Sequence, residues 1–223
     1  MNTKTLARAA AALLAVLVLS FSSELAAQGR QAPPPEYKEL VAASEIRDPA
    51  IRLREFERIK AAFPSTRFME AIDASIMQAK VELSGSLEGV LALQEEFMAK
   101  AQGSSRLLNP STMAVQLVNH PNLAAFDPKA VLAAVNDYRE RAHKAAVDEA
   151  SFAGVPDEQR GYLKTYALSA IELVAAKAQL NAGDVAKAQA SLDAYRKAGG
   201  ATAWHRASAP ARPPRFPVCC PAL

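Results

Sequence analysis

Few side chains in this sequence have the type and spacing that metal chemistry requires. His120 lies in an Asn-His-Pro segment, His143 lies among charged residues of a predicted helix, and His205 is near the C-terminus. A metal site needs ligands at helical or hairpin spacing, such as two histidines four residues apart, and no such pair occurs. We therefore predict three solvated surface histidines, and neither a metal site nor a cofactor site.

Nucleophilic and paired-carboxylate chemistry are also not indicated. A serine nucleophile in Ser84-Gly85-Ser86 would need a strand-to-helix elbow and a paired base, so a helix cap is the better interpretation. Glu95-Glu96 and Asp148-Glu149 are adjacent in sequence, and neighbours on a helix point in different directions instead of flanking one bond. We interpret both pairs as solvated, assign no catalytic residue and expect no enzyme activity.

Three tyrosines leave two interpretations open. Tyr162, Tyr166 and Tyr195 lie on the last two predicted helices. Helical repeat scaffolds bind partners through exposed residues of their inner helices, so these rings could mark a binding surface. Core packing is the favoured alternative, and we assign no binding residue.

The elements that position these side chains are predicted to be helices. Alanine dominates the apolar half of the composition, and β-branched residues are scattered. Asp48-Pro49, Asn109-Pro110 and Asp127-Pro128 each combine a capping side chain with a proline at the first helical position. These pairs predict three helix beginnings.

Apolar spacing of three or four residues predicts the helices themselves. The clearest stripe is Phe68, Ile72, Ile76, Ala79 and Leu83, in a helix that we expect Ser65 to cap. The predicted helices are 36–43, 49–63, 65–83, 87–101, 110–118, 128–145, 157–181 and 185–198. Short loops between them imply antiparallel hairpins, so the expected fold is an all-α array over residues 36–198.

The last predicted hairpin has a specific turn. Gly183 is expected in the left-handed conformation that ends one helix, and Asp184 is expected to cap the next. Val185, Ala188, Leu192 and Tyr195 are expected to face an apolar stripe of the preceding helix.

Residues 1–27 have the features of a signal peptide. Lys4 and Arg8 precede an apolar run, 9–21, that is shorter than the roughly 20 residues a spanning helix needs. Cleavage is expected after Ala27, and no cysteine lies just after the apolar run to carry a lipid anchor. The sequence thus predicts a bacterial periplasmic or secreted protein without a permanent membrane anchor, with a stiff Pro-rich linker over 28–35.

The C-terminal segment 199–223 differs from everything before it. It contains the only tryptophan, both cysteines and five prolines, but neither lysine nor an acidic residue. Two explanations remain open, a frameshift or truncation product of a GC-rich gene and an ordinary disordered Pro-rich extension. The leader contributes +1 and this tail +3 to a formal net charge of +3, which leaves about −1 for the body. The body is therefore near neutral and lacks the basic footprint of a nucleic-acid-binding protein.

The segment from Ala176 through Gly183-Asp184 to Ala188 and Leu192 resembles the centre of a tetratricopeptide repeat. In that family, small residues on both helices and a Gly-Asp-type turn allow close packing. The segment 48–65 is similar to the second half of another repeat. Glu172, Gln179 and Tyr195 depart from the family pattern, and no period of 34 residues is maintained over 66–161. The resemblance implies a short array of stacked helical hairpins.

A second resemblance concerns the order of segments. A leader, a Pro-rich linker and degenerate helical repeats are similar to the N-terminal region of exported bacterial proteins that end in a thioredoxin-like thiol-disulfide oxidoreductase domain. That domain needs a Cys-x-x-Cys motif, whereas Cys219 and Cys220 are adjacent.

Three hypotheses follow. The favoured one is an exported helical-repeat scaffold that binds a protein or peptide partner. The alternatives are the truncated front of a thioredoxin-like oxidoreductase and a self-associating structural protein.

Overall fold

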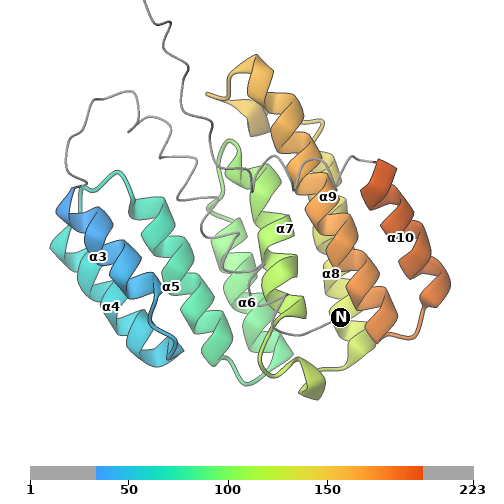
Figure 1. The fold of residues 1–223 in the computed structure, drawn as a ribbon, viewed down its shortest axis with the longest axis horizontal. Coiled ribbons are helices and arrows are strands. Elements are labelled where there is room, and N and C mark those ends of the chain that lie inside the picture. The colour runs from blue at the N-terminus through green and yellow to red at the C-terminus, as the bar shows by residue number, and fades with distance from the viewer. Residues whose placement is uncertain (1–33, 198–223) are drawn as a thin grey trace, which may run out of the picture.

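The structure is a computed structural model that describes residues 34–197. The predicted leader, the linker as far as Pro33, the tail, His205 and both cysteines lie outside the described residues. Within them are eight α-helices, two short 3-10 helices and no strand, so the all-α prediction is confirmed (Figure 1). The α-helices are α3 (Pro35–Ser44), α4 (Pro49–Ala62), α5 (Met69–Leu83), α6 (Leu87–Met98), α7 (Ser105–Val118), α8 (Pro128–Ala145), α9 (Asp157–Asn181) and α10 (Val185–Lys197). The 3-10 helices are η1 (Leu123–Ala125) and η2 (Glu149–Phe152).

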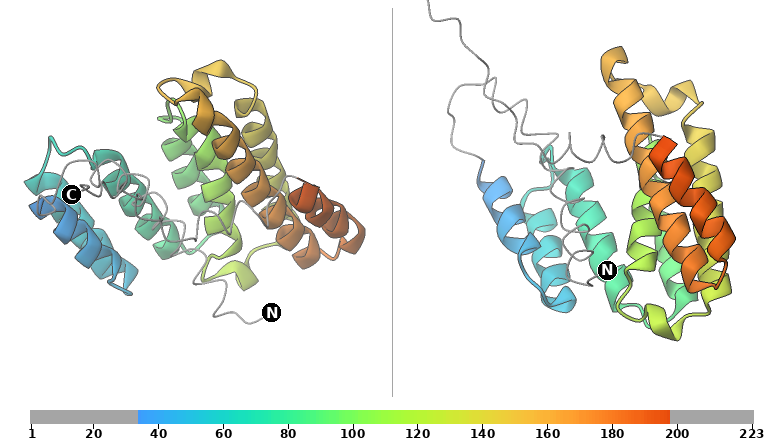
Figure 2. Two further views of the ribbon diagram at one scale, coloured as in Figure 1. Left: turned by 45° about the horizontal axis from the view of Figure 1, so that its top comes forward. Right: turned by 45° about the vertical axis from the view of Figure 1, so that its right-hand side comes forward.

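The helices pack in chain order, as short loops require. Each α-helix contacts the next one along the chain, and α9 contacts α7 as well as α8 and α10. Figure 1 shows the array running from α3 and α4 at one end to α9 and α10 at the other. Figure 2 shows α3, α4 and α5 as a group beside the larger group of α6 to α10. The described chain is thus a stack of antiparallel helical hairpins.

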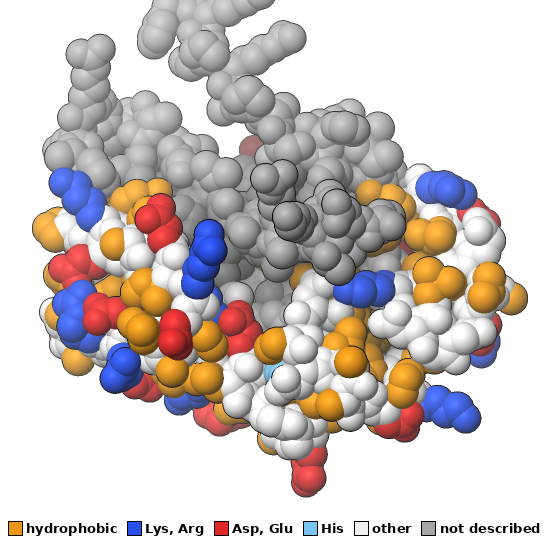
Figure 3. Space-filling view, turned by 60° about the horizontal axis from the view of Figure 1, so that its bottom comes forward, with side chains coloured by type: hydrophobic (Ala, Val, Ile, Leu, Met, Phe, Trp, Pro, Cys, Tyr) orange, Lys and Arg blue, Asp and Glu red, His pale blue; other side chains and the backbone are white. Residues whose placement is uncertain are grey.

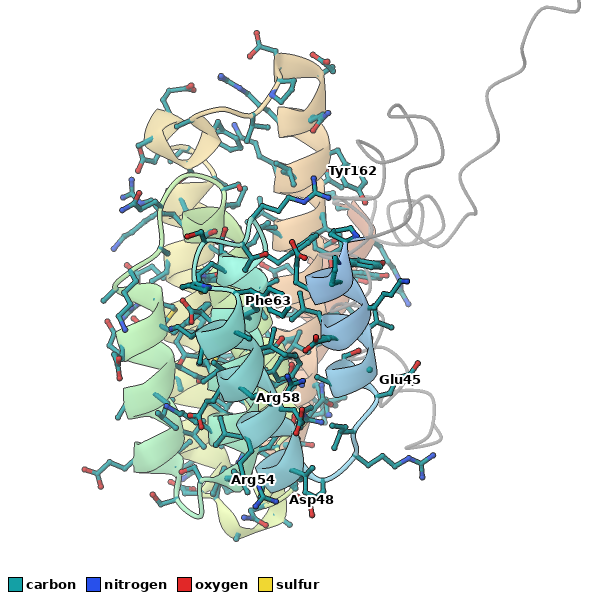
Figure 4. The ribbon with its side chains drawn as sticks, turned by 90° about the vertical axis from the view of Figure 1, so that its left-hand side faces the viewer. Glu45, Asp48, Arg54, Arg58, Phe63 and Tyr162 are labelled. Atoms are coloured by element: carbon teal, nitrogen blue, oxygen red, sulfur yellow. The ribbon has the colours of Figure 1, made fainter. Side chains whose placement is uncertain are left out.

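Most predicted caps are present. Asp48 Oδ1 accepts hydrogen bonds from the N–H groups of Ala50 and Ile51 at the beginning of α4, where Figure 4 places it. Asp127 caps α8 in the same way. Because each carboxylate accepts from otherwise unpaired N–H groups, the helix beginnings are fixed by local sequence.

The turn between α9 and α10 also agrees with the prediction. Gly183 has φ +82°, the N–H of Asp184 donates to the carbonyl of Gln179, and that of Gly183 donates to the carbonyl of Leu180. This is the Schellman arrangement, in which a left-handed residue pairs the last helical carbonyls. Asp184 Oδ1 accepts from the N–H of Lys187 and caps α10.

The Asn109-Pro110 prediction is wrong. Helix α7 begins four residues before Asn109, and Pro110 is buried inside the helix. A proline there removes one intrahelical hydrogen bond. Burial of Leu107 in the first turn, together with a hydrogen bond from Ser105 to Glu70 on α5, holds the extra turn in place. Tertiary packing therefore overrides the local helix-breaking tendency of proline.

Three smaller predictions also need correction. Pro35 is the first residue of α3 and not part of the linker, because its missing N–H has no helical partner at that position. Ser65 caps nothing, because Thr66 stabilises a turn by accepting from the N–H of Phe68, and α5 begins only at Met69. Val185 is 67% exposed and does not face α9, because it is the first residue of α10, at the turn.

The core is divided among three clusters of buried side chains. The largest joins α5 to α9 and contains Val90, Val135 and Ile171. A second cluster lies around Phe152 and Leu107, and a third joins α3, α4 and α5 around Phe56 and Ile72. Helix α5 contributes to both the first and the third cluster, so it connects the two ends of the array.

Lys177 links α9 to the C-terminal end of α7. Its Nζ donates to the carbonyl of Val118 at 2.7 Å and to Oδ1 of Asn119 at 2.8 Å. A cation at this end of a helix complements the unpaired carbonyls and the helix dipole. Burial lowers the pKa of Lys177, because desolvation disfavours the charged ammonium.

Over the described residues, no helix combines the length and apolar character needed to span a bilayer. The face in Figure 3 carries acidic and basic side chains interspersed among apolar ones.

Candidate functional site

An open groove of about 740 Å³ lies between α6 and α8. Its lining is Leu87, Glu88, Leu91, Ala92, Glu95, Ala134, Asp137 and Tyr138. We call this the α6/α8 groove. Its floor is apolar, and the charged side chains among its lining residues, Glu88, Glu95 and Asp137, are all acidic.

The spacing of residues on both helices explains the floor. Leu87 and Leu91 are four residues apart on α6, as are Ala134 and Tyr138 on α8, so each pair lies on one face of its helix. Ala92 and Ala134 are small side chains, which leaves the space between the two helices unfilled. The groove therefore follows from two apolar helix faces that carry small side chains, Ala92 and Ala134, beside the larger Leu87, Leu91 and Tyr138.

A buried polar network supports the floor from below. The hydroxyl of Tyr138 donates to Oε1 of Gln94 at 2.8 Å, and Nε2 of Gln94 donates to the carbonyl of Met113 on α7 at 3.0 Å. Burial raises the pKa of Tyr138, because it disfavours the phenolate. Helices α6, α7 and α8 are joined here by directional bonds as well as by apolar contact.

Glu88, Glu95 and Asp137 form an acidic rim around the groove. This rim has more carboxylates than cationic partners. Nη1 of Arg141 is 2.8 Å from Glu95 Oε2, and its Nε is 2.8 Å from Asp137 Oδ2, so one guanidinium pairs with two carboxylates. Glu88, in the first turn of α6, has no hydrogen bond or ion pair within the part of the chain that the structure describes. Three carboxylates facing one cation leave this rim with a formal excess of negative charge.

A second, separate hollow lies further along the same two helices. It measures about 530 Å³ and lies at the C-terminal ends of α6 and α8, beside the first turns of α7. Its lining includes Met98 and Ala99 of α6, and Arg141 and Ala145 of α8. Its other cations are already paired, since Arg106 is 2.9 Å from Asp148 and Lys144 is 2.8 Å from Glu140.

The arrangement is suited to non-covalent binding. Lining side chains of both hollows include no histidine or cysteine, and the one serine, Ser105, bonds to Glu70. Over residues 34–197 no group of three or more potential ligands could hold a metal ion. An apolar floor with a charged rim can bind a complementary side-chain pattern.

His120 corrects the prediction of a solvated histidine. It is buried, and its Nε2 donates to the carbonyl of Val81 at 2.8 Å while its Nδ1 accepts from the N–H of Asn122. Because a carbonyl can only accept, the proton lies on Nε2. The ring also packs 4.9 Å from that of Phe126, so His120 joins the end of α5 to the loop after α7.

His143 is half exposed but not free. Its Nε2 is 3.2 Å from Oε1 of Glu172, which also accepts from Nε of Arg139 at 2.7 Å. Glu172 is buried, and its other oxygen has no partner among the described residues. These side chains form an ion-paired contact between α8 and α9.

The sequence interpretation of the serines and carboxylate pairs agrees with the structure. Ser86 Oγ accepts from the N–H of Gly89 and caps α6. Glu95 bonds to Arg141 whereas Glu96 pairs with Lys100, so these neighbours do point in different directions. Asp148 and Glu149 likewise pair with different arginines, Arg106 and Arg160.

The three tyrosines do not form one cluster. Tyr162 is 40% exposed, and Figure 4 shows it projecting outward from α9. Its ring stacks on that of half-buried Tyr166, with centroids 6.3 Å apart, whereas Tyr195 lies on α10. Tyr162 therefore does not pack in the core, and the core-packing interpretation is wrong for this side chain.

The sequence does not predict the groove, because some of its residues belong to the apolar face of a predicted helix and others to a face predicted to be solvated. Leu87 and Leu91 belong to the apolar spacing that predicts the helix 87–101, whereas Glu95 is predicted to be solvated. A small residue, Ala92, directly beside the apolar positions of α6 is the one local signal of an open face. No family model matches this chain, and neither a curated protein nor a solved structure matches it.

Proposed function

We propose that this protein is an exported helical-repeat scaffold that binds a peptide segment of another protein in the α6/α8 groove. The observation that carries the proposal is the groove itself, an unfilled apolar floor between α6 and α8. Burying such a floor against a partner is favourable by about 25 cal/mol per Å² of apolar surface. The expected compartment is the periplasm or the exterior, from the leader at 1–27.

The likeness to tetratricopeptide repeats supports the scaffold part of the proposal. Ala176 and Ala188 are both buried, α9 and α10 pack together, and Gly183 takes the left-handed conformation between them. Glu172 and Gln179 are buried polar residues at positions where the family has aromatic side chains. We propose a degenerate array of this kind, in which hairpins differ from the family pattern at such positions.

The test is a selection from a random peptide library displayed on phage. Ala92 is exposed, so replacing it with Arg places a long side chain in the groove without disturbing the core. Ala190→Arg, at an exposed position on α10, is the matched control. We expect enriched peptides to bind the wild-type and Ala190→Arg proteins alike, and the Ala92→Arg protein at least about tenfold more weakly. Failure to enrich any peptide, or equal binding to all three proteins, would overturn the proposal.

A further inference from the structure

We infer that the occupant of the α6/α8 groove is a cationic amphipathic segment, with apolar side chains on the floor and Lys or Arg against the rim. This inference rests on the proposed function and adds the chemistry of the partner. It is carried by the charge of the rim, by the apolar floor and by the length of α8 that lines the two hollows.

The first argument is charge complementarity. Glu88, Glu95 and Asp137 line the groove, and the adjacent Arg141 already contacts two of these three carboxylates. No cation among the described residues pairs with the carboxylate of Glu88, which is therefore the rim carboxylate that a basic partner side chain would meet. An acidic segment would bring like charges together over a floor of low polarity, where repulsion is screened less than in bulk water.

The second argument is the apolar floor. Leu87, Leu91 and Tyr138 present carbon surface between the carboxylates. A purely polar polycation would leave this surface in contact with water, so charge alone does not account for the site. A segment that alternates apolar and basic side chains at helical spacing satisfies both the floor and the rim.

The third argument concerns length and direction. Ala134 and Ala145, the first and last lining residues of α8, are separated by a rise of about 16 Å along the helix axis. The two hollows together thus match a helical segment of about three turns. The cations of the second hollow already have carboxylate partners. The basic end of the segment should therefore lie over the α6/α8 groove.

The experiment uses the purified mature chain and three synthetic helical peptides, each labelled at one end. All three peptides share a leucine face. They differ only in the polar residues at one end, which are Lys in the first peptide, Gln in the second and Glu in the third. Fluorescence anisotropy titrations give the dissociation constants at low and high salt. We expect the Lys peptide to bind at least about tenfold more tightly than the Gln peptide, with the advantage reduced at high salt.

Glu88→Gln is the diagnostic variant, because this carboxylate has no partner to disrupt within the described residues. It should weaken the Lys peptide severalfold and leave the Gln peptide unchanged. Glu158→Gln is the matched control, since Glu158 is likewise an exposed acid in the first turn of a helix, α9. It should change neither affinity.

The outcomes separate this inference from the proposed function. Equal affinities for the Lys and Gln peptides, both abolished by Ala92→Arg, would overturn the cationic inference and leave the groove as a peptide site. If the Lys peptide binds the Ala92→Arg protein as tightly as the wild type, the peptide binds outside the groove. That result would contradict both the cationic inference and the proposed function. Absence of binding by all three peptides would overturn the inference.

Discussion

Tyr138 and Gln94 are joined by a buried hydrogen bond that connects α8 to α6 directly beneath the groove. The phenolic hydroxyl is 2.8 Å from Oε1 of Gln94, and both residues are almost fully buried. The neutral phenol donates this hydrogen bond, and Nε2 of Gln94 donates a second one to the backbone carbonyl of Met113 on α7. The groove is therefore supported by a polar network whose side chains are almost fully buried.

Removing this bond should destabilise the fold. Tyr138→Phe leaves Oε1 of Gln94 buried and unpaired, so we expect the free energy of unfolding to fall by about 1–3 kcal/mol. Urea denaturation followed by circular dichroism measures the change. Tyr195→Phe is the control, because the Tyr195 hydroxyl makes no hydrogen bond to the described residues and its loss should have little effect. Equal midpoints for the two variants would contradict the structural role of the bond.

Stability should fall at alkaline pH because two tyrosines are buried. Burial raises the pKa of Tyr138 well above its usual value of about 10, and raises that of Tyr166 to about 12. A raised pKa means that the folded state keeps protons that the unfolded state releases above pH 10. The stabilisation from both phenols is thus fully present below about pH 10 and is lost as the pH rises through the folded pKa values.

The alkaline effect can be assigned to individual side chains. We expect the unfolding free energy of Tyr166→Phe to depend less steeply on pH above 10 than that of the wild-type protein. Tyr162→Phe is the control, since Tyr162 is exposed, and it should retain most of the wild-type pH dependence. Parallel pH profiles for the wild type and both variants would show that other groups cause the alkaline loss.

A charge in the third core cluster should unfold the N-terminal helices. Ile72 has no exposed surface, so Ile72→Asp buries a carboxylate without a partner and should cost several kcal/mol. Ile76 is only partly buried, and Ile76→Asp should cost less. Leu83→Asp should have the smallest effect, because Leu83 is 46% exposed although it belongs to the same apolar stripe in sequence. Thermal melting temperatures in any other order would contradict the burial along α5.

Two glycines of the last hairpin should respond in opposite directions to the same substitution. Gly183→Ala places a Cβ at φ +82° and should destabilise by about 1 kcal/mol, through backbone strain alone, since no atom lies near the added group. Gly161→Ala lies within α9, also with open space around it, and should stabilise by about 0.5–1 kcal/mol through helix propensity. Chemical denaturation of both variants gives the signs, and a stabilising Gly183→Ala would contradict the turn geometry.

The amino-acid sequence was sufficient to predict the helical class, most helix boundaries and the hairpin turns. Asp48, Asp127 and the Gly183-Asp184 pair act on residues within about five positions along the chain, so their effects can be seen in local sequence. Asn109-Pro110 failed as a helix beginning because a contact with α5 and the burial of Leu107 outweigh one lost hydrogen bond.

Only the tertiary structure decided which polar residues are buried and where the surface is left open. His120 is buried because Val81, 39 residues earlier, presents a carbonyl to it. The groove exists because the small side chains of Ala92 and Ala134 leave space unfilled between α6 and α8. The two helices are far apart in sequence, since their hydrogen-bonded residues Gln94 and Tyr138 are 44 positions apart. Apolar periodicity indicates which face of a helix is able to be buried, whereas the packing of distant helices determines how much of that face is covered.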